Sequence, residues 1–324
     1  MGRIGPIGLI GPMNSITMNG LLVIDKPAGL TSHDVVGRVR HILHERRVGH
    51  TGTLDPFATG VLLVLLGRAT RLAQFLSGDD KEYDAIIRLG YATETGDITG
   101  APLSEPKATT GWTEDQIESA MASLRGDIEQ TPPMYSAKKI GGRKLYELAR
   151  RGEEVDRKPI RVCIHAFTPI RPGGELMKDN RDGTFDLHVH VRCSSGTYVR
   201  TLAEDFGKRL SIGAHLAELK RTSVGLFHLA DAITLEQLKT RFAEEALGTV
   251  VVPPNSALSH MPFVHLSDSD ARRAQHGMEV ETKEAWADGT TVRMCNQDGD
   301  LLAIGDYKED KQLLHPRVVI AAEE

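Results

Sequence analysis

The feature that most constrains the fold is a run of six consecutive apolar residues at positions 61–66. A strand that is apolar at every position must be covered on both of its faces, whereas a strand with one solvated face alternates apolar and polar residues. The run follows residues 49–60, which hold three glycines and one proline and are predicted to form a loop. The sequence therefore predicts a loop immediately before a fully buried strand.

Further elements are predicted on both sides of this run. Helix capping is expected from Thr31 or Ser32 and from Thr113, which has Gln116 three residues later. Residues 93–112 are polar and rich in turn formers, and are predicted to be a connection. The predicted strands are 20–25, 83–89, 160–170 and 184–193, and the predicted helices start near 31 and cover 68–76, 113–124, 144–150, 198–210 and 235–242.

The chain is predicted to divide near residue 255, where Val251-Val252-Pro253-Pro254-Asn255 is typical of a linker. We expect one unit at 18–255, with an insertion at about 130–160, and a second at 262–324. The second unit has a short predicted helix at 269–275 and small strands near 290–295, 301–305 and 316–321.

Residues 1–17 contain several glycines and prolines and lack the unbroken apolar stretch of a signal peptide. We expect them to be a disordered leader. No run approaches the roughly 18 apolar residues of a membrane-spanning helix, so no membrane partner is expected.

Charge is distributed unevenly along the chain, whose net charge is −5. Residues 137–171 hold ten lysines and arginines against four acids, whereas residues 265–324 hold thirteen acids against seven basic residues. A basic segment permits RNA binding, but a solvated surface explains it equally well.

The three cysteines, Cys163, Cys193 and Cys295, form no CxxC pair. They provide neither a usual zinc spacing nor a disulfide framework, and so predict a reducing cytoplasm.

The most informative segment is His50-Thr51-Gly52-Thr53-Leu54-Asp55-Pro56-Phe57-Ala58-Thr59-Gly60. Here a loop carries a carboxylate directly before a buried strand, and its glycines allow backbone to approach a ligand. From this segment alone, an Asp that only caps a turn is an equally ordinary interpretation.

Other kinds of site fit the sequence poorly. The single Gly-Lys pair, Gly207-Lys208, is followed by Arg, so a phosphate-binding loop is excluded, and no Gly-x-Ser-x-Gly elbow is present. His41, His44 and His50 have no carboxylate at ligand spacing, so no metal is expected.

Five segments in order resemble the TruB family of tRNA pseudouridine synthases over about residues 20–225: GLLVIDKPAGLTSHDVVGRVR, GHTGTLDPFATGVL, KEYDAIIRLG, PPMYSAKKIGGRKLYELAR and SSGTYVRTLAEDFG. The resemblance implies an α+β fold. Its catalytic domain is built on a mixed, mainly antiparallel sheet flanked by helices, and a small β-rich PUA-like domain follows. Other pseudouridine synthase families place their Asp after Arg-Leu or Arg-Thr, whereas this chain has Thr-Leu-Asp-Pro.

The resemblance implies a reaction on uridine at position 55 of the tRNA T-loop, a number unrelated to that of Asp55. The enzyme breaks the C1′–N1 bond, turns the uracil and rejoins it through C5. This isomerisation needs no cofactor. The base must first flip out of the RNA. The implied partner is the T-arm of tRNA, bound by a monomer, with the basic insertion in the position of an RNA-gripping loop.

The resemblance also assigns candidate roles to seven residues. Asp55 is the catalytic carboxylate, Arg200 its ion-pair partner, and Tyr83 stacks on the uracil and can move a proton. His50, a flat and weakly cationic group, fills the space the base vacates. Tyr198 packs beside the base, Leu219 lines its pocket, and Lys26 supports the loop or a phosphate.

Several alternatives stay open at this point. Asp55 can attack C1′, remove the 2′ proton to give a glycal, or attack C6 of the base. The chain can also be an RNA-binding or tRNA-folding protein in which isomerisation is secondary, or a guide-RNA-dependent relative. The PPMYSAKK insertion and the lack of a long Lys-rich tail favour the stand-alone type.

Overall fold

The computed structural model describes residues 18–107, 112–136, 139–140, 143–149, 151–153 and 155–320. The predicted leader at 1–17 lies outside the described residues, as do parts of the predicted insertion. No helix in these ranges is both long and apolar enough to cross a bilayer.

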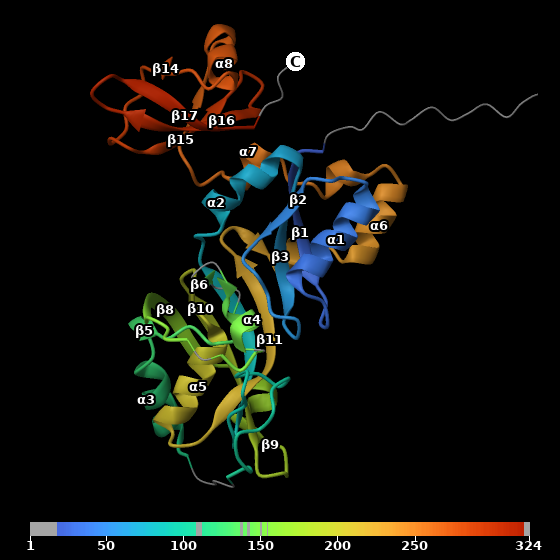
Figure 1. The fold of residues 1–324 in the computed structure, drawn as a ribbon, viewed down its shortest axis with the longest axis vertical. Coiled ribbons are helices and arrows are strands. Elements are labelled where there is room, and N and C mark those ends of the chain that lie inside the picture. Colours follow the sequence, from blue (N-terminus) through green and yellow to red (C-terminus); the bar gives the residue numbers. More distant parts are fainter. Residues whose placement is uncertain are drawn as a thin grey trace, which may run out of the picture.

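A ten-stranded sheet forms the long body of the molecule (Figure 1). In the described part of the chain its neighbouring strands are antiparallel, except for β3 beside β11. The central path runs through β1 (Gly20–Lys26), β3 (Thr59–Leu66), β11 (Ala214–Val224), β4 (Lys81–Leu89), β10 (Phe185–Cys193), β8 (Ile160–Pro169) and β5 (Gly126–Gln130), and β2 (Val48–Thr51), β9 (Met177–Asp179) and β12 (Phe227–His228) pair with β3, β10 and β11.

Strand β3 confirms the prediction of a strand buried on both faces, because residues Val61 to Leu66 have no exposed surface. Its side chains alternate between two apolar clusters. Leu62, Val64 and Leu66 pack with helices α1 (Ser32–Leu43) and α6 (Leu235–Ala243). The alternate residues face the opposite side, where a 3₁₀ helix (Gly67–Leu72), α2 (Ala73–Leu76) and part of the C-terminal sheet cover them.

The other half of the sheet is covered by helices α3 (Glu114–Ala122) and α5 (Val199–Arg209), which share one apolar cluster with β4, β8 and β10. Helix α3 begins as predicted, since Thr113 and Gln116 form a reciprocal capping box. Thr31 caps α1, with Asp34 completing the box.

The insertion contains a two-stranded hairpin, β6 (Lys139–Ile140) with β7 (Arg143–Lys144), and a short helix α4 (Leu145–Ala149). The predicted helix at 144–150 is thus close to the observed one. In Figure 1 this insertion lies across the sheet beside α5.

A second sheet of five strands follows the short helix α7 (Pro254–Ala257) and packs around α8 (Asp268–Gln275). Arg293 ties it to the preceding segment by donating to the carbonyls of Asn255 and Met261. The α+β class with a β-rich C-terminal unit is therefore confirmed. The strands are β13 (Phe263–His265), β14 (Val280–Glu281), β15 (Thr291–Cys295), β16 (Leu301–Lys308) and β17 (Leu313–Val319).

Three local predictions were wrong or incomplete. Residues 49–60 are not a loop throughout, because β2 continues to Thr51 and β3 begins at Thr59. The segment 68–76 is a 3₁₀ helix followed by a single α-helical turn. The set of predicted strands was incomplete, because it lacked β11, an eleven-residue strand in the middle of the sheet.

Candidate active site

The loop between β2 and β3 opens onto a cleft of about 290 Å³. Its floor is formed by β4 and β11 and one wall by the first turn of α5. Five of the seven predicted site residues line it: Asp55, Tyr83, Tyr198, Arg200 and Leu219. Lys26 and His50 do not.

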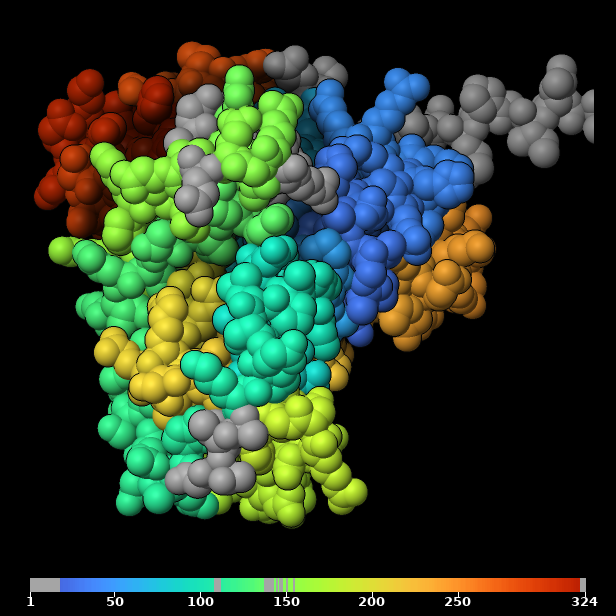
Figure 2. Space-filling view, turned by 60° about the horizontal axis from the view of Figure 1, so that its bottom comes forward, coloured from blue at the N-terminus to red at the C-terminus, as the bar shows by residue number. Residues whose placement is uncertain are grey.

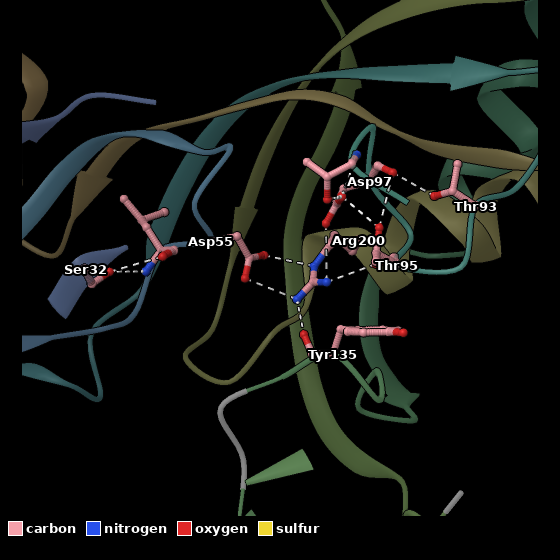
Figure 3. A network of polar contacts seen from close by, with 9 residues as sticks. Ser32, Asp55, Thr93, Thr95, Asp97, Tyr135 and Arg200 are labelled. Carbon is pink, nitrogen blue, oxygen red and sulfur yellow. Dashed lines mark hydrogen bonds and ion pairs between the residues drawn. The ribbon is translucent and has the colours of Figure 1, made fainter. Parts of the chain in front are cut away.

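Asp55 and Arg200 form a two-point ion pair at this cleft (Figure 3). The Arg200 Nε lies 2.9 Å from Asp55 Oδ2, and Arg200 Nη2 lies 3.2 Å from Asp55 Oδ1. The arginine side chain is 5% exposed, whereas the carboxylate keeps 33% of its surface exposed. The pair therefore fixes the direction of the carboxylate while leaving it open to a ligand.

Arg200 is itself held from the opposite side. Its Nη1 donates to the Thr95 carbonyl at 2.9 Å and lies 3.4 Å from Asp97 Oδ2, and its Nη2 donates to the Tyr135 carbonyl at 2.7 Å. Arg200 thus bridges two carboxylates, and Figure 3 shows it between them.

Asp97, a buried residue in the turn-rich segment 93–112, was not predicted from the sequence as a site residue. Its Oδ1 accepts hydrogen bonds from the Thr95 hydroxyl and from the backbone and hydroxyl of Thr99. An Asp flanked by threonines in a turn usually only stabilises that turn, so no signal separated it from its neighbours.

The surroundings of Asp55 act on its ionisation in opposite directions. Burial raises the pKa of its carboxyl above the ordinary value for Asp, and the neighbouring charge of Asp97 adds to this increase. The Arg200 guanidinium opposes the shift by stabilising the charged carboxylate.

Lys26 lies beneath the Asp55 loop, with no exposed surface. Its ammonium donates to the carbonyls of Pro27, Leu30 and Pro56 at 2.9, 2.7 and 3.3 Å. Burial lowers the pKa of Lys26 to about 8. Of the two roles expected for it, this position suits support of the loop rather than contact with a phosphate.

Ser32, at the start of α1, holds the same loop from another side. Its hydroxyl bonds both the Leu54 carbonyl and the Leu54 amide, at 3.1 and 2.9 Å. The loop is thus fixed to α1 directly before Asp55.

The cleft floor carries Tyr83 and Leu219 on neighbouring strands. Tyr83 pairs across the sheet with Arg221, and Leu219 is two residues from Arg221, so these side chains share one face. Burial raises the pKa of the Tyr83 hydroxyl, which therefore stays protonated at neutral pH and can donate a hydrogen bond.

Tyr198 precedes α5 and is fixed by a buried glutamine. Its backbone amide donates to Gln130 Oε1 at 3.0 Å, and Gln130 Nε2 donates back to the Tyr198 carbonyl. Gln130 was not predicted as a site residue. It positions the start of the helix that carries Arg200.

His50 lies in β2, next to the cleft rather than in its lining. Burial lowers the pKa of its imidazole, and the nearby His33 and Arg221 act in the same direction. The imidazole is therefore neutral at pH 7, where the sequence analysis expected a weakly cationic group. Its buried Nδ1 has no hydrogen-bond partner among the described residues.

Within the part of the chain that the structure describes, no three His, Cys, Asp or Glu residues are arranged to hold a metal ion.

Comparison with known proteins gives consistent matches along the chain. The family model described as "TruB family pseudouridylate synthase (N terminal domain)" matches residues 40–199, "tRNA pseudouridylate synthase B C-terminal domain" matches residues 200–259, and "Pseudouridine synthase II TruB, C-terminal" matches residues 262–320.

Two curated relatives are named "tRNA pseudouridine synthase B". The protein from Solibacter usitatus is 41% identical over 305 residues, covering 94% of this chain and all of the relative. The protein from Pseudomonas aeruginosa is 42% identical over 311 residues, covering 94% of this chain and 96% of the relative. Among solved structures, "Crystal structure of the archaeal box H/ACA sRNP Nop10-Cbf5 complex" superposes with a TM-score of 0.68 at 25% identity, covering 94% of this chain and 87% of that chain.

Proposed function

Because the chain belongs to the TruB family of pseudouridylate synthases, we propose that it isomerises uridine to pseudouridine at position 55 in the T-loop of tRNA, with Asp55 as its catalytic carboxylate. The observation that carries the assignment is the pair formed by Asp55 and Arg200 at the mouth of a small cleft. The relatives named for this activity match nearly the whole chain.

The cleft is suited to one flipped base. Its volume of about 290 Å³ is at the small end for ligand pockets. Tyr83 offers an aromatic face and Leu219 an apolar one, which are the surfaces on which an extruded base stacks. Tyr198 closes the cleft beside the helix that carries Arg200.

Three routes are open to Asp55, of which attack on C6 of the base is one, and the other two begin with cleavage of the C1′–N1 bond. The ionised carboxylate can attack C1′ to give a glycosyl ester, or remove the 2′ proton to give a glycal. On both routes the electron pair of the C1′–N1 bond leaves with the uracil. Arg200 keeps the carboxylate charged and correctly directed for either step.

The RNA surface around the cleft should include the basic insertion. On the face in Figure 2 the green insertion lies beside the blue N-terminal part of the chain and above the teal segment near residue 100. Arg143 and Arg151 are exposed there. By contrast, Arg171 forms an ion pair with Glu114, and Arg157 donates to the Pro132 carbonyl. These two guanidinium groups already have partners within the protein and are less available to RNA phosphates.

The proposed setting is a cytoplasmic monomer without a cofactor, acting on the T-arm. In keeping with a reducing compartment, Cys163, Cys193 and Cys295 are free thiols. The matched relatives are named as tRNA-specific enzymes, which favours the stand-alone type over the guide-RNA-dependent one.

The test is isomerisation of an unmodified T-arm hairpin by the pure protein with nothing added. Asp55→Asn and Asp55→Ala should form no pseudouridine yet bind the hairpin with unchanged affinity. Asp205→Asn, on the exposed side of α5, is the matched control and should keep full activity.

Turnover by Asp55→Ala would overturn the assignment of the catalytic carboxylate. Full activity of an Asp55 variant in cells would instead favour the tRNA-folding alternative.

A further inference from the structure

Arg221 is a buried cation on the floor of the cleft, and none of the steps described above uses it. Its side chain extends from β11, and the residue is 1% exposed. Its Nε donates to the Val61 carbonyl at 2.7 Å and its Nη2 to the Gly52 carbonyl at 2.8 Å. Within the described ranges, no carboxylate forms an ion pair with it.

A second cation, Lys81, lines the same floor. It is 7% exposed, and its ammonium donates to the Ser77 and Asp79 carbonyls. Carbonyl oxygens carry only partial charge and cannot neutralise two cations. The carboxylates of Asp79 and Asp80 act on Lys81 and offset part of its charge. Arg221 has no ion-paired carboxylate among the described residues, a buried charge without a partner is costly, and the two adjacent cations repel each other, so the floor favours an anionic guest.

Arg200 and Arg221 differ in whether carboxylates offset their positive charge. Arg200 lies between the carboxylates of Asp55 and Asp97, which offset its charge. Arg221 instead has Tyr83 as its cross-strand neighbour, and its positive charge opposes the rise in the pKa of the Tyr83 hydroxyl. Uncompensated positive charge is therefore on the base side of the cleft, next to the residues proposed to contact uracil.

Gly52 keeps this region open. It has a φ of +64°, and a Cβ at this position would lie 3.4 Å from Arg221 Nη1 and 3.6 Å from Lys81 Cε. A side chain here would both strain the backbone and cover the two cations.

The proposed reaction creates an anion beside them. When the C1′–N1 bond breaks, N1 keeps the electron pair, and the uracil carries one negative charge shared between N1 and its carbonyl oxygens. C1′ then forms an ester with Asp55, or C2′ loses its proton to Asp55 to give a glycal. When C5 then bonds to C1′, the ester bond between C1′ and Asp55 breaks, or, on the glycal route, Asp55 returns its proton to C2′. The C5 proton is lost and N1 gains one, so the sum is an isomerisation.

We propose that Arg221, assisted by Lys81, stabilises the uracil anion released when the glycosidic bond breaks. The inference rests on the proposed function and adds a catalytic residue to it. Fixed donors directed at a developing charge are among the strongest contributions to catalysis, because they need no reorganisation during the reaction.

The test compares uridine with 5-fluorouridine at the target position of the T-arm hairpin, in single turnover with saturating enzyme. Consumption of the target nucleotide is measured for both substrates, because C5 of 5-fluorouridine carries fluorine and has no proton to lose. Fluorine withdraws electrons and makes the uracil a better leaving group, which needs less stabilisation. Arg221→Met should slow the uridine reaction about 10²-fold or more. Its effect on the 5-fluorouridine reaction should be at least several-fold smaller, and its hairpin affinity should be unchanged.

The matched control separates leaving-group chemistry from support of the loop. Ser32→Ala removes both hydrogen bonds to Leu54 without changing a charge. It should slow the two substrates by the same factor. Lys81→Met should show the substrate dependence of Arg221→Met with a smaller loss.

Equal losses on both substrates for Arg221→Met, or none on either, would overturn the proposal. If this variant does not fold, Arg221→Lys decides in its place: it keeps a cation and should lose less rate, again more on uridine than on 5-fluorouridine. If the unaltered protein forms no pseudouridine, the proposed function itself is wrong. This outcome is distinguishable from a failure of the Arg221 proposal alone.

Discussion

Asp97→Asn removes one negative charge from the centre of the site with almost no change of shape. The Oδ1 side of Asp97 receives three donors from Thr95 and Thr99, so the amide oxygen will remain there. The amide nitrogen must then face Arg200 Nη1, which is also a donor. The substitution therefore loses both the ion pair and its hydrogen bond.

The magnitude follows from the 3.4 Å separation of Asp97 and Arg200. Two unit charges at this distance attract by about 5 kcal/mol at an effective dielectric constant of about 20. Most of this is offset, because the neutral amide no longer has the burial cost of a carboxylate. The loss of the hydrogen bond to a charged donor is not offset, and it costs about 2 kcal/mol. The melting temperature should fall by about 3 °C for a chain of this length.

The same substitution should move the pH dependence of the reaction. The charge of Asp97 raises the pKa of Asp55, so its removal lowers that pKa. The carboxylate then stays ionised to lower pH, and the acidic limb of the single-turnover rate profile should shift downward. Asp205→Asn, which removes a partly exposed acid that pairs with Lys208 on α5, is the control and should change neither measurement. An unchanged melting temperature, or an acidic limb that stays or moves upward, would refute the reasoning.

Three further predictions concern the unaltered site, its support and the periphery. In the unaltered protein the midpoint of the acidic limb of the rate profile should lie above about pH 3.9, the pKa of an ordinary Asp, because burial raises the pKa of Asp55. A midpoint at or below that value contradicts this cause. Lys26→Met leaves three carbonyls without their donor, so the free energy of unfolding in urea should fall by roughly 2–3 kcal/mol, and an unchanged midpoint would count against its supporting role. Thr113→Ala removes the cap of α3 and should cost about 1 kcal/mol without changing turnover, since α3 does not line the cleft; a loss of activity would show that α3 affects the site.

The elements that were predicted from sequence have local causes. Residues Val61 to Leu66 are apolar without interruption, and a strand buried on both faces is the structure that this pattern favours. The side chains of Thr113 and Gln116 each accept a hydrogen bond from the backbone amide of the other residue. The start of α3 therefore depends on two residues that are three positions apart in the chain. Asp55 was found because its loop has an unusual composition that resembles one family.

The elements that were missed depend on distant contacts. Strand β11 buries His215 and Arg221 among its apolar residues, which hides the alternation expected of a strand. His215 bonds the Tyr91 carbonyl, and Arg221 bonds carbonyls of the Asp55 loop and β3. Asp97 gained its importance only when Arg200, 103 residues away, was brought next to it. No local pattern carries that information.

The apolar cluster behind β3 has a consequence for any attempt to divide the protein. Val61, Leu63 and Leu65 share this cluster with Ile304, Val318 and Ile320 of the C-terminal sheet. Removing the second sheet would leave the back of the strand that carries the catalytic loop in contact with water. A shortened chain should therefore expose this apolar surface and aggregate instead of yielding a smaller working enzyme.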